Sequence, residues 1–327
     1  MSIVSIDQTV MPHRRELCFA GAACNLSTTS VELAKVLEDL SVTTGNVGGS
    51  RFSMRVVVDE LMTGPAESPH FRGLHHIVIA SFGVSNIFVF DVLRRSLSAR
   101  VSASVARDLQ FWKQKLIPIA LGVLGSAMGL VPVHCACLES EGDGLLIAGN
   151  SGAGKSTLST ALSQNGFNYV SDDWTYMSEH RDTLVAYGTS APVKLLPDAV
   201  QHFRNLSSYS VHTSMNGELA YEVDMGSVFG AHVVPSCEPR WLIFLERMEK
   251  PGCEFVRLSS ADTRSYLESS IETLPMQLAE ANERRSQVLE NISALPCWSF
   301  RYGGTPQFAT EQLREFVVSR KLEEVYA

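Results

Sequence analysis

Residues 147–174 read IAGNSGAGKSTLSTALSQNGFNYVSDDW, which places a glycine-rich loop shortly before two adjacent aspartates. Gly149, Gly154, Lys155 and Ser156 fit the pattern G-x-x-x-x-G-K-[ST], whose glycines let backbone N–H groups turn inward around phosphate oxygens. The pattern predicts a nucleotide-binding loop. The residues expected to bind the nucleotide are Gly149, Asn150, Ser151, Gly152, Ala153, Gly154, Lys155, Ser156 and Thr157.

The segments around the loop predict its place in a sheet. GLLIAG reads as a short buried strand, STLSTALSQ as a helix and FNYVS as the next strand, which ends at Asp172 and Asp173. If the two strands are parallel, the aspartates lie at the same sheet edge as the loop, where open α/β sheets bind ligands. We therefore expect the loop and the aspartates to face one site.

The residue types at this expected site suit phosphoryl transfer. Lys155 can reach the β- and γ-phosphates of a nucleotide, and Ser156 can ligate Mg²⁺. We assign the metal to Ser156 and one carboxylate of the pair, here Asp172, and the other carboxylate, Asp173, takes the proton of an attacking hydroxyl. The sequence does not distinguish which aspartate has which role. Two aspartates after a strand are also common in turns and helix caps, but a complete phosphate loop beside them favours the catalytic interpretation.

Composition limits the class of protein. The chain has 327 residues, 45% of them hydrophobic, and a net charge of -8, so it can bury a core and lacks the broad cationic surface of a nucleic-acid or anionic-membrane binder. Seven scattered cysteines fit reduced thiols, and the first residues show no secretory signal, which predicts a cytoplasmic protein. The uncharged stretch from Leu116 to Val133 approaches the length of a membrane helix, but its prolines and glycines favour buried core.

The two ends of the chain differ in their patterns. Residues 1–109 are rich in strand-like segments and contain no recognisable catalytic motif, so we expect a substrate-binding or partner-binding region there. Residues 110–327 contain the phosphate loop, and the boundary rests on the change to the helical segment ARDLQFWKQKL. Glu246, Arg247 and Arg301 end strand-like runs, where ordinary surface charges are the commoner case.

The run VPVHCACLESEGDGLLIAGNSGAGKSTLSTALSQNGFNYVSDDW, from Val131 to Trp174, resembles the HPr kinase/phosphorylase superfamily. The resemblance implies an α/β fold with a C-terminal P-loop kinase core of the HPr kinase and PEP-carboxykinase type, here preceded by a strand-rich α+β region. It also implies that His134 is the active-site histidine, whereas a lone histidine on an apolar strand is more often a core residue. The catalytic residues so expected are Lys155, Asp172, Asp173 and His134.

The chain departs from the family where a further metal-binding carboxylate is expected. YGTSAPVKLLP contains none, and Lys194 stands there instead, which argues against a reverse phosphorylase reaction. The resulting expectation is an ATP-dependent and Mg²⁺-dependent kinase that phosphorylates a hydroxyl, foremost serine, in a small molecule, peptide or small protein. A non-catalytic ATP-binding regulator and a nucleotide hydrolase are the alternatives, and the resemblance also allows a homo-oligomer.

Overall fold

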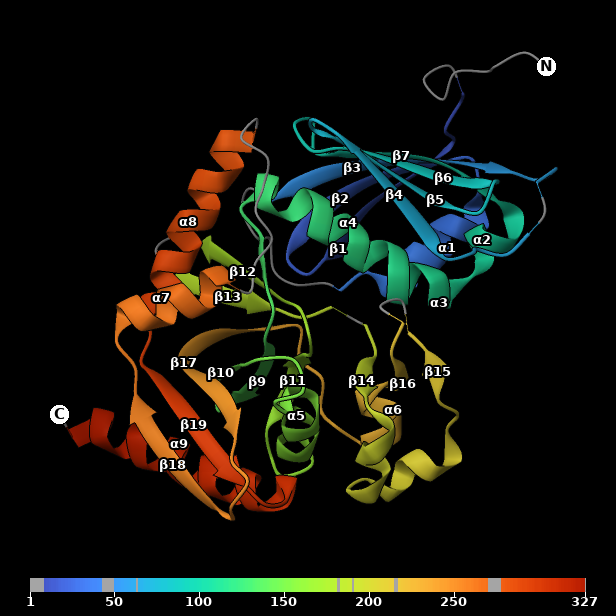
Figure 1. Ribbon diagram of the computed structural model, residues 1–327. Coiled ribbons are helices and arrows are strands. Elements are labelled where there is room, and N and C mark those ends of the chain that lie inside the picture. The colour runs from blue at the N-terminus through green and yellow to red at the C-terminus, as the bar shows by residue number, and fades with distance from the viewer. Residues whose placement is uncertain are drawn as a thin grey trace.

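The computed structural model describes residues 9–42, 50–62, 64–180, 183–189, 191–214, 217–269 and 278–326. These residues form a mixed α/β fold with sheets of seven, nine and three strands. In Figure 1 the seven-stranded sheet lies at the top, the nine-stranded sheet lies below it, and the small sheet stands beside the second one.

The first sheet has the strand order β1-β2-β3-β7-β6-β5-β4. Its strands alternate apolar and polar residues, so one face is buried and the other faces outward, as in the pattern RFSMRVVVD of β3. The helices of this region lie on the buried face (Figure 1). The strands are β1 (His13–Phe19), β2 (Ala22–Thr28), β3 (Arg51–Asp59), β4 (Pro69–Leu74), β5 (Ile77–Phe82), β6 (Asn86–Asp91) and β7 (Ser96–Ser102).

Helix α1 (Val31–Leu40) follows β2 and packs on the first sheet. Ser30 is the N-cap, and its hydroxyl accepts a hydrogen bond from the backbone N–H of Leu33 at 3.3 Å. Apolar residues at helical spacing, among them Leu33 and Leu37, are fully buried against the sheet. Helices α2 (Ala103–Arg107) and α3 (Leu109–Phe111) follow β7.

The apolar stretch from Leu116 to Val133 is divided between several elements. A π-helical turn (Trp112–Leu116) leads into α4 (Ile117–Leu124), a 3₁₀ turn (Gly125–Met128) and β8 (Val131–Val133). No helix within the described ranges is long and apolar enough to cross a membrane. The buried residues of this stretch up to Leu130 join the core of the first sheet, which so passes the expected boundary at residue 109. Val131 and Val133 join a cluster of the second sheet.

The second sheet carries the glycine-rich loop. Its order is β11-β9-β10-β17-β13-β12-β8, and β19 pairs with β17 and β18. Strand β9 lies between β10 and β11 and is antiparallel to both, so β10 and β11 run in the same direction. The strands are β9 (Ala136–Ser140), β10 (Asp143–Ala148), β11 (Asn168–Ser171), β12 (Thr175–His180), β13 (Thr183–Tyr187), β17 (Ser236–Arg247), β18 (Gly252–Arg257) and β19 (Cys297–Gly303).

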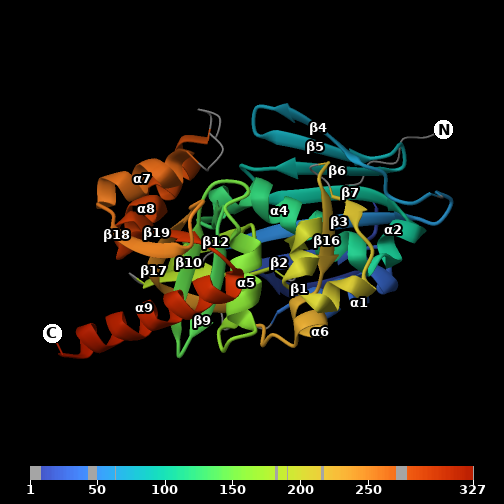
Figure 2. The ribbon, with the colours of Figure 1, turned by 60° about the horizontal axis from the view of Figure 1, so that its bottom comes forward.

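Helices cover both faces of this sheet (Figures 1 and 2). Leu145 and Ile147 of β10 pack in a cluster with residues of α5 (Lys155–Ser163) and α9 (Pro306–Tyr326). Leu146, which lies between them in the strand, packs in another cluster with residues of α7 (Ser260–Ser269) and α8 (Ala279–Ala294). Burial on both faces explains why this strand is a continuous apolar run.

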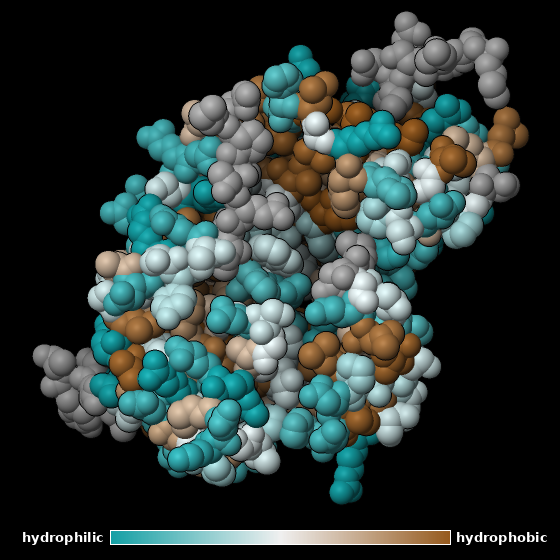
Figure 3. Space-filling model, in the orientation of Figure 1, coloured by the Kyte–Doolittle hydropathy of each residue, from teal (hydrophilic) through white to brown (hydrophobic). Residues whose placement is uncertain are grey.

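The third sheet belongs to a small lobe beside α5. It contains β14 (Val193–Leu195), β16 (Leu219–Val223) and β15 (His212–Thr213), and it is followed by α6 (Met225–Phe229). Apolar residues of the lobe, including Val193 and Leu195, join the core that contains α5. On the face shown in Figure 3, apolar residues gather near the first sheet and over this lobe, and hydrophilic residues dominate elsewhere.

Candidate functional site

The glycine-rich loop connects the end of β10 to the start of α5. Gly149, Gly152 and Gly154 have φ angles of 147°, 80° and 94°, a region in which side chains are strained. A Cβ on Gly149 would also lie 2.7 Å from the carbonyl oxygen of Leu245, so no other residue fits there. The glycines of the sequence pattern therefore bend the backbone around the start of α5, where helix N–H groups remain available to an anion.

Lys155 occupies the first position of α5 and is 8% exposed. Its Nζ donates hydrogen bonds to the carbonyl oxygens of Gly149 at 2.8 Å and Asn150 at 3.3 Å. Burial lowers the pKa of Lys155, and the negative charges of Asp173 and Asp172 act against this shift. The ammonium group is thus folded back over its own loop, within reach of any phosphate that the loop holds.

Asp172 follows β11 and lies close to the start of α5. Its Oδ1 accepts a hydrogen bond from Ser159 at 3.3 Å, while its buried Oδ2 has no hydrogen-bond partner among the described residues. Burial raises the pKa of Asp172 from 3.8 to about 6, the charge of Asp173 adds to the increase, and the hydroxyls of Ser156 and Ser159 oppose it. A buried carboxylate oxygen without a partner beside Ser156 is a suitable ligand for a cation.

Asp173 adopts a left-handed backbone conformation with a φ of 64°, which is uncommon outside glycine but tolerated by aspartate. Its Oδ1 lies 2.9 Å from Nε2 of His134, a residue in the turn between β8 and β9. Burial raises the pKa of Asp173. The hydrogen bond from His134 and the positive charges of His134, Lys194 and Lys155 outweigh burial, so the pKa is lowered. The His134 ring also lies 5.5 Å from the ring of Trp174.

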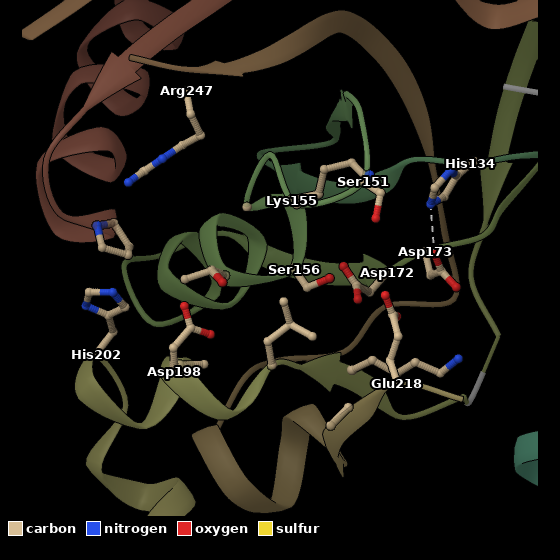
Figure 4. Close-up of a pocket in the computed structure, with 18 of the residues that line it drawn as sticks. His134, Ser151, Lys155, Ser156, Asp172, Asp173, Asp198, His202, Glu218 and Arg247 are labelled. Carbon is tan, nitrogen blue, oxygen red and sulfur yellow. Dashed lines mark ion pairs between the residues drawn. The ribbon is translucent and has the colours of Figure 1, made fainter. Parts of the chain in front are cut away.

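These residues surround one cavity of about 260 Å³, shown in Figure 4. The loop and α5 form one side, Asp172, Asp173 and His134 form the inner end, and the small lobe forms the opposite wall. Of the residues predicted from sequence, Gly149 and Asn150 lie outside the lining of this cavity, and Ala153 is buried behind the loop. The lining includes His134, Ser151, Gly152, Gly154, Lys155, Ser156, Thr157, Asp172 and Asp173.

Three residues that line this cavity from the small lobe had no signal in the sequence. Asp198, His202 and Glu218 come from the small lobe, and the carboxylate of Glu218 extends toward Asp172 and Asp173 (Figure 4). Lys194 lines the same wall. Arg247 and Tyr302 close the other end, where the guanidinium of Arg247 lies 4.4 Å from the centre of the Tyr302 ring.

The described residues contain no group of three or more His, Cys, Asp or Glu side chains placed to hold a metal by themselves. Mg²⁺ usually keeps several waters and binds through one or two carboxylates together with substrate phosphates. Ser156 and the unpartnered Oδ2 of Asp172 fit that mode, and Glu218 is a further carboxylate on the facing wall.

Comparisons with known proteins add little to this geometry. No protein-family model matches the chain. No curated protein matches it. Among solved structures, it is similar to the Hpr(Ser) kinase/phosphatase from Coxiella burnetii, with 14% identity, a TM-score of 0.33, and coverage of 60% of this chain and 96% of that chain. A similarity at this TM-score does not assign a function to the chain.

Proposed function

We propose that the protein is an ATP-dependent phosphotransferase that moves the γ-phosphate to a hydroxyl, foremost that of serine. The observation that carries this proposal is the convergence of the glycine-rich loop, Lys155, the pair Asp172 and Asp173, and His134 on one cavity. A phosphate-binding loop alone serves many functions. A paired carboxylate and histidine beside it supply what transfer to a hydroxyl needs in addition.

The proposed roles follow from the contacts of each residue. The loop amides and Lys155 hold the β- and γ-phosphates, and Ser156 with Asp172 holds Mg²⁺. The bound cation supplies positive charge that neutralises the phosphate oxygens during transfer. Asp173 is ionised, because its pKa is lowered, and it holds the ring of His134 through Nε2. This pair receives the proton of the hydroxyl acceptor.

The same proposal includes the finer expectations from sequence. Residues 110–327 contain the HPr-kinase-like P-loop core, although residues 111–130 pack against the first sheet. Residues 1–109 bind the substrate or a partner. Lys194 stands on the wall facing the two aspartates, where its charge stabilises a transferring phosphoryl group. The protein works in the cytoplasm on a small molecule, a peptide or a small protein.

Replacement of the loop lysine tests this proposal. Lys155→Ala should leave a folded protein, because the side chain contacts loop carbonyls and contributes little to the core. It should lower phosphate transfer from labelled ATP by about a thousandfold or more, since the main phosphate contact is lost. The measurements are product formation in a cell extract supplied with γ-labelled ATP, affinity for a non-hydrolysable ATP analogue by calorimetry, and circular dichroism.

The extract assay also separates the alternatives. A regulator binds the analogue but gives no labelled product in the wild type, whereas a hydrolase releases only inorganic phosphate. Near-normal transfer by folded Lys155→Ala protein would exclude the site proposed here. Lys35→Ala, a change at an exposed position of α1 on the first sheet, is the matched control and should behave as wild type.

A further inference from the structure

A second cavity opens on the other side of the glycine-rich loop. Its volume is about 310 Å³, within the size of sites for small molecules. The walls come from the start of the loop at Gly149 and Asn150, the end of β17, helix α7 and strand β19. The side chains that characterise it are Phe244, Glu246, Tyr266, Ser269, Arg301 and His134.

His134 joins this cavity to the first one. Among the described residues it is the single one that lines both. Its Nε2 faces Asp173 of the first cavity at 2.9 Å, and its ring is held beside Trp174. The imidazole therefore stands at the boundary between the two spaces in a fixed orientation.

The ends of β17 and β19 divide their side chains between the two cavities. In β17, Glu246 lines the second cavity and Arg247 lines the first. In β19, the paired positions repeat this division, since Arg301 lines the second cavity and Tyr302 the first. Successive residues of a strand point to opposite sides, so the two cavities are built from one alternating pattern.

The second cavity presents both charges beside an aromatic surface. Oε2 of Glu246 accepts a hydrogen bond from Nε of Arg301 at 3.1 Å, and Oε1 accepts one from Ser299 at 2.9 Å. Nη1 of Arg301 also lies 3.8 Å from Oε2 of Glu254, so Nη2 is the nitrogen that offers donors to a ligand carboxylate. The Glu246 carboxylate retains lone pairs for an ammonium. The rings of Phe244 and Tyr266 lie 4.6 Å apart and form the apolar part of the wall.

We infer that the second cavity binds the phosphate acceptor, a small hydroxyl compound that carries both an ammonium and a carboxylate group. The inference rests on the proposed kinase function. In-line displacement requires the attacking and leaving oxygens on opposite sides of phosphorus. His134 lines both cavities, so a hydroxyl that approaches His134 from the second cavity can meet a γ-phosphate held in the first.

The proposed transfer step takes place at the boundary between the two cavities. The acceptor oxygen forms a bond to the γ-phosphorus while the bond from that phosphorus to the bridging oxygen breaks. The electron pair of the broken bond stays on the β-phosphate of ADP. The proton of the acceptor hydroxyl passes to His134, which Asp173 holds in place.

A panel of hydroxyl compounds and four variants test the inference. The probes are L-serine, L-threonine and L-homoserine, with ethanolamine, D-glycerate and glycerol as analogues that lack one or both charges. Transfer from γ-labelled ATP should favour at least one amino acid over every analogue by about tenfold or more in kcat/KM. Glu246→Gln and Arg301→Gln should each raise the KM of that amino acid by about tenfold, with the ATP-analogue Kd changed less than about threefold.

Arg247→Gln should have the opposite effect. It should raise the Kd of the ATP analogue and leave the KM of the acceptor nearly constant. Arg240→Gln is the matched control, because Arg240 pairs with Asp143 at the other end of β17. A preference for an analogue, an unchanged KM in both cavity variants, or ATP hydrolysis without transfer to any probe would each overturn the inference. A wild-type protein that does not bind the ATP analogue would instead overturn the proposed function.

Discussion

In the first sheet Asp59 and Asp91 each pair with an arginine, whereas in the second sheet Asp172 is placed where one carboxylate oxygen is buried without a partner among the described residues. The hydrogen bond from Arg100 lowers the pKa of Asp59, and burial raises that of Asp172 to about 6. The same residue type is thus stabilised as a carboxylate in one region and destabilised in the other. Unfavourable placement of a charge concentrates at sites that bind ligands.

The two regions differ in what their buried side chains do. The first sheet buries aromatic side chains such as Phe82, Phe88, Phe111 and Trp112 in edge-to-face contacts, an arrangement that serves stability. The second sheet brings together, at one edge, Asp173 in a left-handed backbone conformation, the buried Lys155 and the buried carboxylate of Asp172. Three substitutions test this division between a stabilising region and a strained one.

The largest expected change in stability comes from the core of the first sheet. Phe88 is fully buried and its ring lies 5.5 Å from that of Phe82. Phe88→Ala should lower the free energy of unfolding by about 3–5 kcal/mol, because it removes buried area and leaves a cavity. Urea unfolding measures this loss, and Phe88→Leu is the milder matched change. Affinity of the folded variant for an ATP analogue should stay at the wild-type value; an equal loss of affinity would show that the two regions are not separable.

An intermediate effect of opposite sign is expected at Asp172. Its folded pKa of about 6 exceeds the ordinary 3.8, so the folded state binds the proton more tightly, and stability falls as the pH rises from about 4 to 6. Asp172→Asn removes this loss, so above pH 7 and without Mg²⁺ it should be more stable than wild type by up to about 3 kcal/mol. Below pH 4 the two proteins should be equally stable.

Urea unfolding at several pH values, in a chelating buffer, measures the difference at Asp172. Asp173→Asn is the matched control on the neighbouring residue. The pKa of Asp173 is lowered, so this carboxylate stabilises the fold above its unfolded pKa, and its replacement should not stabilise the protein at neutral pH. An Asp172→Asn protein no more stable than wild type at pH 7.5 would remove the contrast between the two sheets.

The smallest effect is expected at Asp59. Its lowered pKa means that its stabilising contribution is present above the unfolded pKa and is lost as the pH falls through the folded pKa. Because its ion pair with Arg100 lies at the surface, Asp59→Asn should cost less than about 1 kcal/mol at pH 7, and less again in 1 M salt. Thermal unfolding at two salt concentrations checks the sign, and a more stable variant would contradict it.

The sequence predicted the local part of the site. The order of strand, loop, helix and strand follows from glycines, apolar runs and the paired aspartates, which lie within 28 residues of each other in the quoted stretch. The prediction that the loop and aspartates share one sheet edge depends only on the common direction of β10 and β11. Strand β9 lies between these two strands, and the shared direction still holds.

Long-range packing determined the rest. Asp198, His202 and Glu218 reach the cavity because Val193 and Leu195 anchor the small lobe against α5, and no short motif encodes such a contact. Glu246, Arg247 and Arg301 looked like surface charges, since a strand end alone does not reveal the cavity that it borders. Likewise, the helical segment ARDLQFWKQKL does not reveal which sheet it covers, and the core that includes Phe111 and Leu121 assigns it to the first sheet.

The alternating ends of β17 and β19 have an evolutionary consequence. Glu246 and Arg247 are encoded by neighbouring codons, as are Arg301 and Tyr302, yet the two residues of each pair line different cavities. A single missense change can therefore alter what one cavity recognises and leave the other cavity's lining intact. Under the proposed function, descendants of this protein can diversify their acceptors while they inherit an unaltered nucleotide site, with no rebuilding of the sheet.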